Sequence, residues 1–83
     1  MTSKEHLNIK VRGKDIFGAA FGEKAKLVAV ADNEVSLSMV RPVEKHALLE
    51  VQFYDNEAYW MQGQVINVRN HLDGTQTVRV KMH

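Results

Sequence analysis

The stretch at residues 7–23, LNIKVRGKDIFGAAFGE, decides how this chain folds. Its first six residues alternate between apolar and polar types, with Leu7, Ile9 and Val11 as the apolar set. Because successive side chains of a β-strand point to opposite faces, this alternation predicts a strand with one buried face. Asp15 and several glycines follow, and these residue types favour tight turns. We therefore expect a strand, a turn and a second strand.

Further runs along the chain have the same β-type patterns. They lie at residues 27–31, 34–39, 48–54, 59–68 and 77–82. Short polar pairs separate some of these runs, and their residue types tolerate the left-handed backbone of hairpin turns. These pairs are Asp32-Asn33, Asp55-Asn56 and Asp73-Gly74. The runs and the pairs together predict about six short strands joined mostly by tight hairpins.

Two segments depart from the simple pattern. In the run at 59–68 the apolar residues change face, which predicts a β-bulge near Gly63. Residues 41–47 contain Pro42, the only proline, and are expected to form either a loop or one short helical turn. A chain of 83 residues has room for a single core. The predicted fold class is therefore all-β, with residues 1–83 forming one small antiparallel β-barrel domain.

Composition and charge exclude several function classes. The chain has 11 Lys and Arg against 10 Asp and Glu, a balance that does not indicate a nucleic-acid partner. It has no cysteine, which excludes thiolate metal sites and fits a reducing compartment. Residues 1–10 lack the apolar segment of a signal peptide, and no apolar run is long enough to cross a bilayer. We expect a cytoplasmic protein without a membrane partner.

No residue pattern indicates an enzyme. Ser36 and Ser38 lie on a predicted strand, and no signature pairs either of them with a histidine base and an acid. The four histidines, His6, His46, His71 and His83, do not have the spacing of metal ligands. We therefore expect no catalytic residue, no metal and no cofactor.

The opening also resembles a known family. Its spacing is carried by Ile9, Val11, Gly13, Asp15, Gly18, Phe21 and Glu23. This spacing resembles the V-x-V-x-G-x-D-x-x-G-x-x-F-x-E opening of bacterial PilZ domains. The resemblance implies a small barrel in cyclic di-GMP signalling. From the residue types alone, Asp15 and Glu23 are expected to accept hydrogen bonds from turn amides, and Phe21 to cap one end of the barrel.

The two cyclic di-GMP motifs of that family do not match this chain. No R-x-x-x-R pair precedes the first strand, where Lys4 and His6 are the only basic residues, and Arg12 stands alone. The [D/N]-x-S-x-x-G motif would fall on Ala29, Ala31 and Glu34. We therefore expect an atypical PilZ-like adaptor that acts through protein interaction. The alternative is cyclic di-GMP binding outside the family motifs, with Lys4, His6, Lys10, Arg12, Asp32 and Ser36 as candidate ligand-binding residues.

Aromatic residues supply the candidate protein-interaction site, at Tyr54, Tyr59 and Trp60. Tyr59 and Trp60 are adjacent on a predicted strand, so one of them should point outward unless a bulge intervenes. The outward ring either binds a partner or covers an end of the barrel. A further alternative is a single-stranded nucleic-acid-binding barrel that stacks bases on these rings. Glu50, Asp55 and Glu57 surround the cluster with negative charge, which disfavours a nucleic acid.

Overall fold

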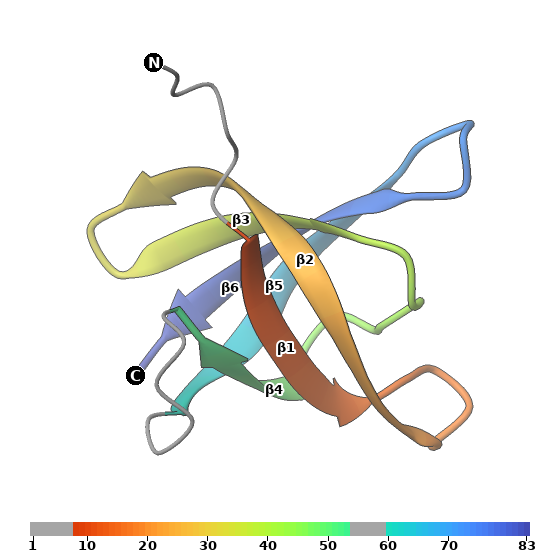
Figure 1. The fold of residues 1–83 in the computed structure, drawn as a ribbon, viewed down its shortest axis with the longest axis horizontal. Coiled ribbons are helices and arrows are strands. Elements are labelled where there is room, and N and C mark those ends of the chain that lie inside the picture. Colours follow the sequence, from red (N-terminus) through yellow and green to blue (C-terminus); the bar gives the residue numbers. More distant parts are fainter. Residues whose placement is uncertain (1–7, 54–59) are drawn as a thin grey trace.

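A computed structural model describes residues 8–53 and 60–83 of the chain. These residues form six strands and no helix (Figure 1), so none of them belongs to a helix that could span a membrane. The strands are β1 (Asn8–Lys14), β2 (Ala20–Ala31), β3 (Glu34–Met39), β4 (Leu48–Gln52), β5 (Met61–Asn70) and β6 (Gln76–Met82). The predicted all-β class and strand number are confirmed.

The strands close into an antiparallel barrel in the order β1-β2-β3-β6-β5-β4. The alternating residues face inward as predicted, with Val11 opposite Val51 and Leu37 opposite Val78. The core consists mainly of branched aliphatic side chains, with one phenylalanine, one methionine and one alanine: Ile9, Val11, Phe21, Ala25, Val35, Leu37, Met39, Val43, Leu49, Val51, Val65, Val78 and Val80. Because each strand turns one face toward this core, the side chains on the opposite face of the strand point outward and are available for binding.

Strand β2 is longer than the sequence pattern indicates. It begins at Ala20 and pairs with β1 up to Lys26, so the second strand expected in the opening and the run predicted at 27–31 belong to one continuous strand. Phe21 and Ala25 point inward from the added part. A register shift between Leu27 and Ala29 then changes the pairing with β3. The first half of β2, paired with β1, builds the outer face described below.

The bulge predicted in this run is present, but it does not lie at Gly63. The register shift in β5 lies between Val65 and Asn67, so that Ile66 is the extra residue. Gly63 has a different role, because a Cβ atom at this position would lie 2.5 Å from Val80 Cγ1 and 3.1 Å from the Lys81 carbonyl oxygen. The glycine therefore permits a close approach between β5 and β6.

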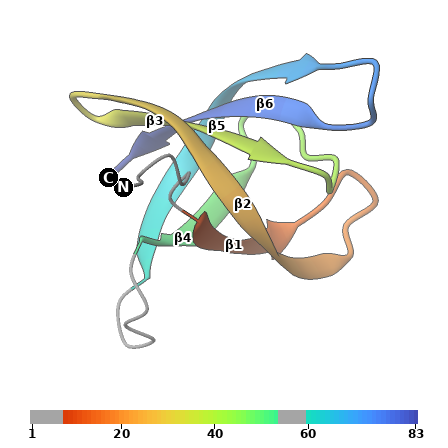
Figure 2. The same ribbon diagram turned by 45° about the horizontal axis from the view of Figure 1, so that its top comes forward.

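The connections divide between the two ends of the barrel (Figures 1 and 2). The β1–β2 turn, the β3–β4 connection and the β5–β6 turn lie at one end, and the β2–β3 turn lies at the other. Residues 41–47 form a loop without a helical turn, and Val43 from this loop is buried. In the β2–β3 turn Asp32 has a φ of 23°, which confirms the left-handed backbone expected there.

Candidate binding face

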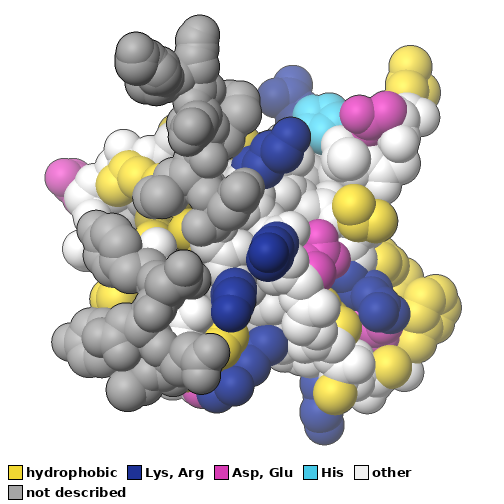
Figure 3. Space-filling model, in the orientation of Figure 1, with side chains coloured by type: hydrophobic (Ala, Val, Ile, Leu, Met, Phe, Trp, Pro, Cys, Tyr) yellow, Lys and Arg dark blue, Asp and Glu magenta, His cyan; other side chains and the backbone are white. Residues whose placement is uncertain are grey.

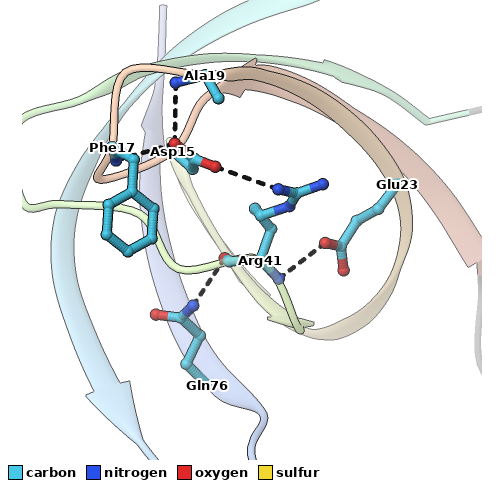
Figure 4. A network of polar contacts seen from close by, with 6 residues as sticks. All are labelled: Asp15, Phe17, Ala19, Glu23, Arg41 and Gln76. Atoms are coloured by element: carbon cyan, nitrogen blue, oxygen red, sulfur yellow. Dashed lines mark hydrogen bonds and ion pairs between the residues drawn. The ribbon is translucent and has the colours of Figure 1, made fainter.

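Asp15 and Glu23 from the opening stretch connect the β1–β2 turn to the β3–β4 loop at one end of the barrel (Figure 4). The Asp15 carboxylate accepts hydrogen bonds from the amides of Phe17 at 2.9 Å and Ala19 at 3.0 Å. Its second oxygen lies 3.2 Å from Arg41 Nη1. The amides of Ala19 and Phe17 and the Arg41 guanidinium hold the pKa of Asp15 below its ordinary value, against the effect of burial. Gly18, within this turn, has a φ of 81°.

Glu23 and Gln76 hold the same loop from two other strands. The Glu23 carboxylate accepts hydrogen bonds from the amides of Val40 and Arg41, each at 2.8 Å. Gln76 Nε2 donates to the Arg41 carbonyl oxygen at 2.7 Å. The Arg41 guanidinium also lies 5.7 Å from the centre of the buried Phe21 ring. The prediction that Asp15 and Glu23 accept hydrogen bonds from turn amides is therefore confirmed, and these carboxylates are engaged in structure.

A group of cations lies on the outer face of β1 and β2. We call this the basic face, and it consists of Lys10, Arg12, Lys14, Lys24 and Lys26. Four of these side chains are exposed and Lys10 is half-buried. Lys and Arg side chains gather in Figure 3 on the side where β1 and β2 lie nearest the viewer. Lys10 lies directly opposite Lys24 in the β1–β2 ladder. Like charges in such a pair destabilise a sheet, so the fold itself does not account for this arrangement.

Arg12 is fixed on the β4 side of the basic face. Its Nε lies 2.7 Å from Glu50 Oε1, and its guanidinium carbon lies 3.9 Å from the centre of the Trp60 ring. Trp60 is half-buried and immediately precedes β5. The guanidinium therefore stacks on an aromatic ring while its edge is held by a carboxylate, a geometry that lysine does not reproduce.

A shallow hollow of about 260 Å³ lies beside Arg12, between the ring and the lysines. It is lined by Lys10, Val11, Arg12, Gly22, Glu23, Lys24 and Trp60, and Gly22 lies opposite Arg12 in the β1–β2 ladder. The Glu23 carboxylate is engaged by the amides of Val40 and Arg41. A Cβ atom at Gly22 would meet nothing closer than 3.9 Å, and Gly22 does not have a positive φ. Neither packing nor backbone conformation therefore requires glycine at this position. Because Gly22 has no side chain, the space between the neighbouring Arg12 and Lys24 side chains stays open.

The structure brings some of the predicted site residues together and separates others. Lys10 and Arg12 lie side by side on the basic face with Trp60. Ser36 lies on β3, the strand next to the basic face, where it pairs with Ala29 of β2 and Arg79 of β6. Asp32 lines an apolar groove of about 490 Å³ at the end of the barrel that carries the β2–β3 turn. The remaining candidates, Lys4, His6, Tyr54 and Tyr59, lie outside the described residues.

Sequence reasoning missed Gly22, Lys24 and Lys26 as parts of the face. A signal was present, because Gly22, Lys24 and Lys26 alternate with Phe21 and Ala25 in the period of a strand. Among residues 8–53 and 60–83, no group of three His, Asp or Glu side chains is arranged to hold a metal ion. Comparisons with protein-family models, with curated proteins and with solved structures found no match.

Proposed function

We propose that this protein is a non-enzymatic adaptor on a PilZ-like barrel, and that it binds a protein partner through the basic face and Trp60. The observation that carries the proposal is the stack of Arg12 on Trp60 within a group of lysines that form no ion pair with a described carboxylate. Arginine and tryptophan are the residue types that contribute most to protein–protein binding energy. The resemblance of the opening to PilZ domains supports a role in bacterial signalling, and the lack of cysteine supports a cytoplasmic location.

The distribution of charge favours a compact acidic partner over a long polyanion. The basic face holds five of the eleven Lys and Arg, and Glu50 beside Arg12 is the only acid paired with it among the described residues. The rest of the chain has six Lys and Arg against nine Asp and Glu. A nucleic-acid strand that continues beyond the face would meet no further excess of positive charge to hold its phosphates. An acidic patch on a protein has no such extension.

Photo-crosslinking in the cells that produce the protein tests this proposal. A crosslinking amino acid replaces Lys26 at the margin of the basic face, and in a matched control it replaces Lys81, an exposed lysine of β6. We expect a crosslinked protein from position 26 alone, and its loss when Trp60→Ala is added. Equal products from positions 26 and 81, or a product unaffected by Trp60→Ala, would contradict the proposal.

Cyclic di-GMP remains a second candidate, because Lys10 and Arg12 lie together beside an aromatic ring. A guanidinium and an aromatic ring are both suited to stacking on guanine. Titration with cyclic di-GMP, followed by heat of binding and by amide chemical shifts, tests it. Saturable binding with shifts on β1 and the first half of β2 would support this candidate. Flat heats and unmoved amides at millimolar ligand would remove it.

A further inference from the structure

The chain's five glycines differ in what the fold requires of them. Gly18 and Gly74 have positive φ angles, of 81° and 92°. At Gly13 and Gly63 an added Cβ atom would lie only 2.7 Å and 2.5 Å from a neighbouring side chain. Gly22 alone meets neither condition, although a glycine within a strand weakens it. The hollow that Gly22 lines is therefore the feature that can account for a glycine at this position.

The charges around this hollow are not balanced within the described part of the chain. Arg12 is paired with Glu50, but no described carboxylate pairs with Lys10 or Lys24. The Cβ atoms of directly opposite residues in a sheet lie about 4.5–5.5 Å apart, so the stems of Lys10 and Lys24 start side by side and their two positive charges share one part of the face. A single dianion between them would relieve their repulsion and match their charge.

We propose that the hollow over Gly22 binds a phosphate group, held between Lys10 and Lys24. A phosphate monoester has a charge of about −1.5 to −2 near neutral pH, which matches the two lysines, and its oxygens accept several charge-assisted hydrogen bonds. Gly22 is paired with Arg12, two residues along the ladder from the Lys10–Lys24 pair, and its lack of a side chain leaves room for the phosphate beside these two lysines. Arg12 and Trp60 form the wall on the β4 side and contact the group that carries the phosphate.

Two carriers have this chemistry, a phosphorylated side chain and a nucleotide. The first is the one we propose, and in this form the inference rests on the proposed function, because it names the group by which the partner is recognised. The second would place a base against the Arg12 and Trp60 wall. Both carriers require the same phosphate position and therefore the same lysines.

Amide chemical shifts of the 83-residue chain provide the test. The probes are inorganic phosphate, a glycine-flanked phosphoserine peptide, its unphosphorylated counterpart and GMP. We expect phosphate and the phosphopeptide to shift the amides of Lys10, Gly22 and Lys24, and the unphosphorylated peptide to leave them in place. Lys24→Gln should weaken binding about tenfold, because it removes a charge-assisted hydrogen bond. Lys81→Gln, a matched loss of charge on β6, should have no effect.

Gly22→Val separates the hollow from the charge. Valine suits a strand and is expected to leave the fold intact, with its amide pattern elsewhere unchanged, while it fills the floor and abolishes phosphate binding. Unmoved amides with phosphate and the phosphopeptide, equal losses in Lys24→Gln and Lys81→Gln, or full binding by Gly22→Val would each overturn the inference. Tighter binding of GMP than of the phosphopeptide would support the phosphate site and assign it to a nucleotide. A crosslinked partner that depends on Trp60, in a protein that binds no phosphate, would overturn this inference alone.

Discussion

Two glycine-to-alanine substitutions, Gly22→Ala and Gly63→Ala, should change stability in opposite directions. Both residues lie in strands and neither has a positive φ, so alanine is compatible with both backbones. At Gly22 the added Cβ meets nothing closer than 3.9 Å, and the lower entropy of the unfolded chain should stabilise the protein by about 0.5–1 kcal/mol. At Gly63 it would lie 2.5 Å from Val80 Cγ1, and such overpacking costs about 1–3 kcal/mol.

Urea denaturation measures the difference. The two variants should differ by about 1.5–4 kcal/mol in the free energy of unfolding, with midpoints on either side of the wild-type value and unchanged slopes. In a domain of this size each kcal/mol corresponds to about 4–8 °C in Tm, so a thermal scan gives an independent check. A Gly63→Ala variant as stable as the wild type, or a Gly22→Ala variant that is less stable, would refute the reasoning on both glycines.

Three further predictions concern Leu37 in the core, the hydrogen-bonded Asp15 carboxylate, and the stack of Arg12 on Trp60. Leu37→Ala should lower the free energy of unfolding by about 2–5 kcal/mol, because the side chain is fully buried, and a loss below 1 kcal/mol in urea denaturation would contradict its place in the core. Asp15 has a pKa below its ordinary value in the folded chain, so its stabilising contribution is present above about pH 4 and is lost as the pH falls through its folded pKa. Asp15→Asn should therefore be less stable than the wild type at pH 7 and approach it at low pH, whereas a difference independent of pH would contradict the assignment. Arg12→Ala should shift the emission of Trp60, the only tryptophan, to the red and increase its quenching by acrylamide, and unchanged emission would mean that the guanidinium does not cover the ring in solution.

The fold followed from the sequence where a single strand pattern was enough to identify an element. Residues 34–39 alternate without interruption, and β3 has these bounds. The second strand of the opening and the run at 27–31 were predicted separately, and only pairing with β1 shows that they form one strand that begins at Ala20. The bulge was misplaced for a similar reason. Its position at Ile66 depends on the register between β5 and β6. The glycine at position 63 is instead required by the close approach of Val80 across that ladder.

The candidate site was only partly accessible from the sequence. Lys10, Arg12 and Trp60 were named, but in two separate groups with different expected roles. Their meeting depends on barrel closure, since β1 pairs with β4 and this pairing brings Glu50 opposite Arg12. No local pattern reports such a contact between distant segments. The role of Gly22 could not be predicted either, because the sequence does not show which glycines are required by packing and which leave open space.

The closed order of strands also sets the timing of folding. Four of the six ladders join strands that are consecutive in sequence, but the β1–β4 and β3–β6 ladders join distant segments. Such pairings must pay the entropy of loop closure before they gain contacts, and proteins rich in them fold in milliseconds to seconds. During synthesis, β3 has no second neighbour until β6 has left the ribosome. A chain arrested before Gln76 therefore exposes an unpaired strand edge, the feature through which nascent β-proteins aggregate.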